Sequence, residues 1–191
     1  MEQLLFVLVA LVLVSFSSGQ DFCHQKKCPS YQVEETNKDF EVRLYAATDW
    51  ITTKVDGKAA TEVVAASQRL KNFCERQKEA GQEIQDAWPA LLTVTGDEDN
   101  PDVSMSWFVH PGLKPEILDT SVTLQHRDAT TVYVRSFGGM PSIESGRENA
   151  KILREALAEA GKAYNSNSFV GAAYDSYFSL THHNEIWIYA A

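Results

Sequence analysis

The sequence has few cysteines and fewer basic than acidic residues, and both shortages narrow the classes of protein it can belong to. Three cysteines in 191 residues are too few for a fold held together by many disulfides. With 26 Asp and Glu against 17 Lys and Arg, the net charge is -9. Because nucleic acids and anionic membranes are bound through clustered Lys and Arg, we expect neither as the main partner. The remaining composition, 44% hydrophobic and 23% charged, is that of a globular domain.

The chain also lacks the catalytic motifs that a single sequence can reveal. It has no Gly-x-Ser-x-Gly, no Gly-x-x-x-x-Gly-Lys-Ser/Thr loop and no His-Glu-x-x-His. Glu185 is the nearest hint of an enzyme, because it lies two residues from Trp187 on a predicted strand, and such residues face the same side. A structural role for Glu185 is the stronger interpretation. We therefore predict that the protein is not an enzyme.

The N-terminus resembles a secretory signal peptide. Residues 4–14 are all apolar, and small and polar residues follow up to Gly19. A membrane-spanning helix needs about 20 apolar residues, so this run has the length of a signal-peptide core. We predict a signal peptide at residues 1–19, secretion to the extracellular space, and no stable membrane insertion after cleavage. An uncleaved anchor is the alternative.

An oxidising compartment changes how the cysteines are interpreted. Cys23 and Cys28 lie close together in a predicted N-terminal extension, residues 20–30, where a local disulfide would fix the chain. A metal site that includes His24 is the alternative, although no second ligand pair is present. Cys74 falls in a helical pattern and is predicted to be a small buried residue, but its pairing with Cys23 or Cys28 stays open. The chain has no Asn-x-Ser/Thr sequence, so N-glycosylation is not expected.

The hydrophobic pattern of residues 31–191 changes between the period of a strand and that of a helix, in the same order twice. The first half predicts two strands within 31–55, a helix at 58–78, and strands at 89–95 and 103–110. The second half predicts strands at 122–126 and 131–137, a helix from Ser142 to Gly161, and strands at 169–174 and 185–189. No linker or low-complexity segment divides them. The pattern indicates one α+β domain that is internally duplicated, with a curved sheet or barrel and two helices.

Several segments, in this order and spacing, resemble the SOUL haem-binding protein family. They are residues 132–139, 153–157, 161–165, 173–176 and 184–188 in the second half, and 31–33, 40–45 and Trp50 in the first. The resemblance spans residues 31–188, so we predict a SOUL-like haem-binding domain at 31–191. It implies two βαββ-like repeats that form a distorted antiparallel β-barrel with two flanking helices. It also implies non-covalent binding of haem, as a ligand rather than a catalytic cofactor, or of another tetrapyrrole.

The residues that some family members offer to haem differ here. A histidine proposed as an iron ligand corresponds to Leu44, and two basic helix positions correspond to Val64 and Asn72. Lys71 and Arg69 lie nearby on the same helix and would replace the basic positions. The predicted site therefore combines apolar contacts, a basic residue and optional iron ligation by histidine: Leu44, Val63, Leu70, Phe73, Lys71, His110, and the pair His182 and His183.

Two functions follow as hypotheses. The first is binding of haem or another tetrapyrrole outside the cell, as a carrier or scavenger. The second is a binding module for a different apolar small molecule or for a protein partner, with haem binding lost. Leu44 favours the second, because it cannot ligate iron. The sequence identifies no protein partner.

Overall fold

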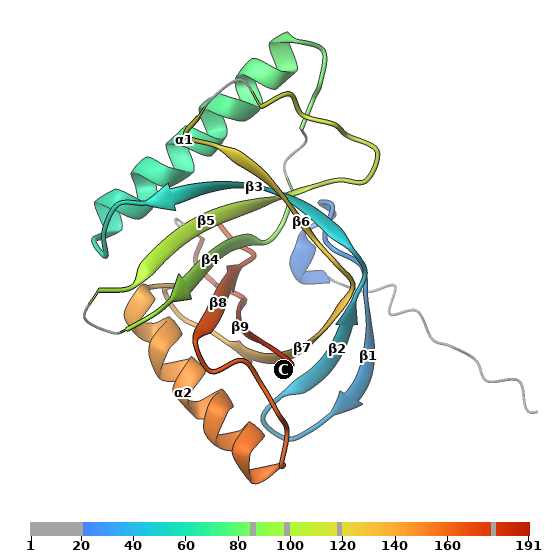
Figure 1. Cartoon of the computed structure of the whole chain (residues 1–191), viewed down its shortest axis with the longest axis vertical. Coiled ribbons are helices and arrows are strands. Elements are labelled where there is room, and N and C mark those ends of the chain that lie inside the picture. The colour runs from blue at the N-terminus through green and yellow to red at the C-terminus, as the bar shows by residue number, and fades with distance from the viewer. Residues whose placement is uncertain (1–20, 85–86, 98–99, 118–119, 177–178) are drawn as a thin grey trace, which may run out of the picture.

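The computed structural model describes residues 21–84, 87–97, 100–117, 120–176 and 179–191, so the predicted signal peptide lies outside the described residues. Figure 1 shows a strongly curved sheet with two helices on its outer side. A short 3-10 helix, η1, spans Asp21–Cys23, and the α-helices are α1 (Ala60–Glu79) and α2 (Ile143–Glu159). The strands are β1 (Tyr31–Thr36), β2 (Glu41–Tyr45), β3 (Thr48–Val55), β4 (Ala90–Thr95), β5 (Asp102–Val109), β6 (Thr123–Arg127), β7 (Thr130–Phe137), β8 (Ser168–Ala173) and β9 (Asn184–Tyr189). None of the described helices is long and apolar enough to cross a membrane.

All nine strands form one antiparallel sheet, in the order β1-β2-β7-β9-β8-β4-β5-β3-β6. Without β1, this order is symmetric about the β8–β4 pair: β7-β9-β8 on one side mirrors β3-β5-β4 on the other. Each repeat also gives its first strand to the other one, because β2 pairs with β7 and β6 pairs with β3. The predicted duplication is thus confirmed. The sheet curves like a barrel but stays open, since its edges β1 and β6 are not paired with each other.

Each helix covers the outer face of its own repeat. α1 packs on β3 and β5, and α2 packs on β7, β8 and β9. The buried residues of α2 include Gly146, Ala150, Leu153 and Leu157, which are three or four positions apart and so share one face. Ser142 begins this helix as the N-cap residue, and its hydroxyl and that of Ser145 form a reciprocal capping box.

The sheet has a hydrophobic core on each face. The outer core lies beneath the helices and includes Leu70, Phe73, Leu153 and Ile186. The inner core lies on the concave face and is rich in aromatic residues: Tyr45, Trp50, Phe108, Tyr174 and Trp187, with Leu91, Val132, Val134, Val170 and Ala172. Since both faces of the sheet are covered, almost all residues of a central strand such as β9 are buried.

The N-terminal segment closes part of the concave face. Cys23 and Cys28 form the predicted disulfide, and Cys23 is 4% exposed within the inner core. The backbone N–H of Trp88 donates to the carbonyl of Lys27 at 2.9 Å, which ties the segment to the chain before β4. Cys74 remains a thiol, half-buried on α1 against the outer core. This arrangement resolves the pairing that the sequence left open.

One prediction about the strands is wrong, because residues 31–55 contain three strands instead of two. The additional strand, β1, is at the edge of the sheet, and its side chains are almost all exposed. It is held by backbone pairing with β2, so it needs no buried apolar residues at alternate positions. That is why the hydrophobic pattern did not indicate it. The other strands and both helices agree with the prediction within a few residues at each end.

Candidate functional site

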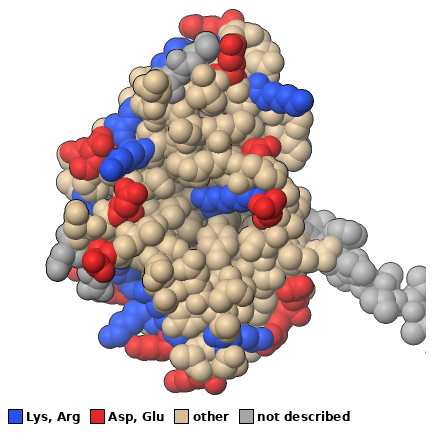
Figure 2. Space-filling model, viewed as in Figure 1, with Lys and Arg blue, Asp and Glu red and all other residues tan. Residues whose placement is uncertain are grey.

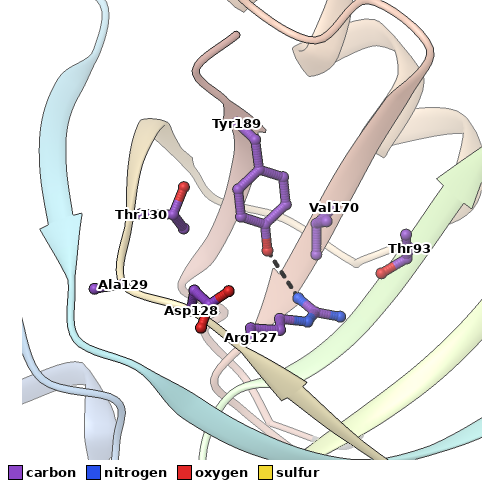
Figure 3. Close-up of a pocket in the computed structure, with 7 residues that line it drawn as sticks. All are labelled: Thr93, Arg127, Asp128, Ala129, Thr130, Val170 and Tyr189. Atoms are coloured by element: carbon purple, nitrogen blue, oxygen red, sulfur yellow. Dashed lines mark hydrogen bonds between the residues drawn. The ribbon is translucent and has the colours of Figure 1, made fainter.

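A pocket of about 380 Å³ opens on the concave side, where the turn between β6 and β7 meets β4, β8 and β9 (Figure 3). Its lining residues are Thr93, Arg127, Asp128, Ala129, Thr130, Val170 and Tyr189. β6 is an edge strand and β7 lies near the opposite edge of the curved sheet, yet only two residues join them. The turn must therefore cross the concave side at this point. The volume is at the lower end of the range for small-molecule sites.

Arg127 is the only Lys or Arg among the residues that line this pocket. Its Nη1 donates to the hydroxyl of Tyr189 at 2.8 Å, and its guanidinium lies 5.2 Å from the ring centroid of Trp50. Trp50 itself is 1% exposed and donates to the Thr48 hydroxyl. Two aromatic side chains therefore hold the guanidinium of Arg127 in place beside the pocket.

A second polar group, a buried ion pair, lies within the inner core. Glu185 is 0% exposed, and its Oε1 accepts a hydrogen bond from Nη1 of Arg43 at 2.9 Å and lies 3.1 Å from Nε2 of His183. Its Oε2 accepts from the Tyr174 hydroxyl at 2.8 Å and from Nε1 of Trp187 at 2.7 Å. Arg43 also bonds to Glu41 and lies over the ring of Tyr31. Both carboxylate oxygens are thus occupied by protein groups.

The ionisation of this cluster follows from its contacts. Burial alone would raise the pKa of Glu185, but the hydrogen bond with His183, the charge of Arg43 and the bonds from Trp187 and Tyr174 outweigh it and lower the pKa. Burial opposes the charge of Arg43, yet the Glu185 carboxylate raises the pKa of this guanidinium. Burial and the negative charge of Glu185 raise the pKa of Tyr174 well above its ordinary value. Glu185 is therefore a charged and fully hydrogen-bonded structural group.

The N-terminal segment seals this cluster. Phe22 stacks on His183 with ring centroids 4.4 Å apart and meets the edge of Tyr174 at 4.8 Å. His24 bonds to Asp175 at 2.8 Å, and Asp175 also accepts from the backbone N–H of His183. The imidazole of His183 is consequently held between Phe22 and Glu185.

The predicted apolar haem contacts lie on the other side of the sheet. Leu70 and Phe73 are buried in the outer core beneath α1, and Val63 packs at its edge. Lys71 is exposed on the same helix, and Leu44 is half-buried in β2. The structure thus brings three of these residues together, but as packed core. Haem could contact Leu70 and Phe73 only if α1 moved away from β3.

The three predicted histidine ligands lie in two places. His182 and His183 immediately precede β9, and His183 is six residues from Tyr189, about 20 Å along an extended strand. His110 follows β5, and the β5–β3 and β3–β6 registers place it beside Thr48, about 10 Å or two strand spacings from Arg127. His110 is therefore the predicted ligand nearest the pocket. Of the three, His182 has buried ring nitrogens with no hydrogen-bond partner in the described part of the chain.

The sequence did not identify Arg43, Arg127 or Thr93 as site residues. Arg43 alternates with apolar residues in β2, which normally indicates a side chain facing solvent. It faces a covered concave surface instead, and only the second layer of packing decides that. Arg127 precedes a short turn and carries no sequence signal.

A wider hollow of about 670 Å³ runs along α2, and charged side chains of both signs line it: Glu144, Arg147, Glu148, Lys151, Arg154 and Glu155. Figure 2 shows the same mixture of signs over the face in view, with acidic and basic side chains interspersed. Val94, Tyr164 and Phe169 also line this hollow, so charged and apolar side chains share its wall, whereas the wall of the concave pocket is mainly apolar. The concave pocket is therefore the better candidate.

Comparison with known proteins identifies the family. Residues 26–189 match the family described as "SOUL heme-binding protein". Human "Heme-binding protein 2" is 24% identical over 157 residues, which cover 78% of this chain and 77% of the human protein. The EcmrR C-terminal domain has a TM-score of 0.56 at 13% identity, covering 84% of this chain and 98% of that domain. A hydrolase from Listeria innocua has a TM-score of 0.54 at 10% identity, covering 83% and 94%.

The two solved structures share only the fold with this protein, because their sequence identities are so low. The family match is different in kind, since it extends over both repeats, both helices and the pocket. This chain belongs to the SOUL haem-binding protein family.

Proposed function

We propose that this protein binds haem or another tetrapyrrole non-covalently outside the cell, as a carrier or scavenger. The observation that carries the proposal is the family match over residues 26–189. The name of the human relative, which refers to haem binding, supports the same ligand. The extracellular location is supported by the signal-like residues 4–14 and by the Cys23–Cys28 disulfide, a bond that persists in oxidising compartments.

The concave pocket offers groups that haem binding requires. Tyr189 supplies aromatic surface, and Arg127 supplies a positive charge for a propionate. His110 is the predicted ligand nearest this pocket, whereas His182 and His183 precede the far end of β9 and are too distant to serve the same macrocycle. Because the pocket is small, it would hold one edge of the macrocycle and leave the rest over the rim.

The proposed role is binding rather than catalysis. A general base or nucleophile needs a free lone pair facing a substrate. Glu185, the carboxylate that the sequence suggested for such a role, is fully buried and makes hydrogen bonds through both oxygens. It has no access to a substrate in this arrangement.

A haem titration of the secreted protein, followed by Soret absorption, tests the proposal. The expected result is a saturable shift that weakens in His110→Ala and is unchanged in His126→Ala, an exposed histidine of β6 that bonds to Asp49. Weakening in His182→Ala/His183→Ala instead would place the iron at the other end of β9. A shift that none of these variants alters would mean that apolar contact alone holds the haem.

A specific observation favours one alternative, binding of a different apolar small molecule. Leu44 occupies the position of the family's proposed iron ligand, and His183 is held by Phe22 and Glu185. Metal-free protoporphyrin in competition with haem separates the two functions. Equal affinity for both would identify a site that does not use the iron. No saturable shift at micromolar haem would refute the proposed haem function.

A further inference from the structure

The pocket on the concave side contains a positive charge that no group of the described chain neutralises. Arg127 is half-buried, and its contacts are a neutral hydroxyl and an aromatic face. No described carboxylate is within ion-pair distance of its guanidinium. Its neighbour Asp128 is fully exposed and lies 3.6 Å from Nε2 of His126 instead. A guanidinium without an anionic partner can bind a carboxylate through its N–H donors, so this one is available to a ligand.

A second unsatisfied group lines the same pocket. The hydroxyl oxygen of Thr93 is buried and has no hydrogen-bond partner among the described residues. Most buried polar atoms in folded proteins have a partner. Arg127 has five N–H donors, and one hydrogen bond to a described residue. Figure 3 shows Arg127, Tyr189 and Thr93 around the same opening.

The rest of the wall is mainly apolar and includes Ala129, Val170 and Tyr189, with Thr130 and the exposed Asp128 as its polar members. Val170 belongs to the inner core, and Tyr189 packs against it. Val170 is 0% exposed, so the ring of Tyr189, on the neighbouring strand, supplies the flat surface next to the charge. A pocket with one flat apolar wall and one cation selects a flat apolar molecule with a carboxylate at its edge.

We propose that this pocket is a carboxylate-recognition site for a flat apolar ligand, with Arg127 binding the carboxylate and Tyr189 contacting the flat face. If the proposed function is correct, the carboxylate is a propionate of the tetrapyrrole. The site itself does not depend on that function, because a smaller aromatic acid satisfies the same chemistry. The half-buried position of Arg127 reduces screening by salt.

The experiment uses naphthalene-2-carboxylate as the probe, with the neutral naphthalene-2-methanol as the matched compound, in calorimetric titrations of the secreted protein. The acid is expected to bind the wild type more tightly than the alcohol. Arg127→Gln should weaken binding of the acid by about tenfold or more and leave the alcohol unchanged, because it removes only charge-assisted hydrogen bonds. Arg127→Lys should restore part of the preference. Lys151→Gln, on the exposed side of α2, is the control and should leave the binding of both compounds unchanged.

Two further measurements test the site if Arg127→Gln folds poorly. The first is the NMR spectrum of the wild type, in which the probe should shift the methyl signals of Val170. The second is a titration of Thr93→Val, in which binding of the acid should weaken more than binding of the alcohol. NMR shifts confined to other parts of the molecule would refute the proposed site. An equal loss of affinity for both compounds in Arg127→Gln would refute it as well.

The haem titration distinguishes failure of the site from failure of the proposed function. Haem binding that is the same in wild type and Arg127→Gln would refute this site as the haem site and leave the function standing. Selective binding of the naphthalene acid through Arg127, together with no haem binding, would refute the function and leave the site standing.

Discussion

Replacement of Arg43 by Met should destabilise the fold strongly, because it leaves Glu185 charged and buried without its cation. The pair is 2.9 Å apart, and neither side chain is more than 4% exposed. Removing one partner of a buried ion pair typically costs about 3–5 kcal/mol. The hydrogen bonds to Glu185 from Tyr174 and Trp187 remain, so we expect a loss near the lower end of that range.

Unfolding in urea, followed by the fluorescence of the buried Trp50 and Trp187, measures this loss. Lys151→Met, exposed on α2, is the control and should change the free energy of unfolding by less than about 0.5 kcal/mol. In the Arg43→Met background, Glu185→Gln should recover stability, because it removes the uncompensated charge. A double variant that is less stable than Arg43→Met alone would refute the reasoning.

The pH dependence gives an independent check with a definite sign. The pKa of Glu185 is lowered in the folded protein, so its charge contributes stability above the pKa of an unfolded carboxyl, and that contribution is lost as pH falls through the folded value. Without Arg43, burial favours the neutral carboxyl of Glu185. The variant should therefore lose less stability than the wild type on acidification. The difference in the free energy of unfolding between wild type and Arg43→Met should therefore shrink from pH 7 to about pH 4.

Three further predictions concern the N-terminal segment, α2 and β6. In Cys23→Ser/Cys28→Ser, loss of the small disulfide ring removes about 2 kcal/mol of local stability. The amide proton of Trp88, which donates to the Lys27 carbonyl, should therefore exchange with solvent about 30-fold faster, as measured by NMR. Unchanged exchange would show that packing alone holds the segment. Ser142→Ala removes the N-cap of α2 and should lower the free energy of unfolding in urea by about 1 kcal/mol, and a neutral result would contradict the capping box. The hydrogen bond to Asp49 raises the pKa of His126, so an NMR titration should find a lower pKa in Asp49→Asn.

Most of the fold could be predicted from the sequence, because local patterns encode it. The helix around Leu153 and Leu157 follows from their spacing, and its start follows from Ser142. Strand β7 follows from the alternation around Tyr133. Strand β1 could not be predicted in this way, because an exposed edge strand has no buried face to leave a pattern.

The candidate site was less predictable, because it is made of residues far apart in the chain. Arg43 and Glu185 are 142 positions apart, and β2 and β9 are brought close only because both pair with β7. Likewise, Arg127 contacts Trp50 and Tyr189 because the curved sheet brings β6 over β9. No local pattern records such contacts.

The sequence by itself determined the helices, nearly all the strands, the internal duplication, the Cys23–Cys28 pair as a candidate and the family resemblance. These depend on residue periodicity and on short motifs, which are properties of neighbouring residues. Only the tertiary structure decided that the sheet has two covered faces, that Leu70 and Phe73 belong to the outer core, and that Arg127 meets an apolar wall. The physical reason is that burial and charge pairing depend on which distant strands become neighbours, and the exchange of β2 and β6 between the repeats fixes that.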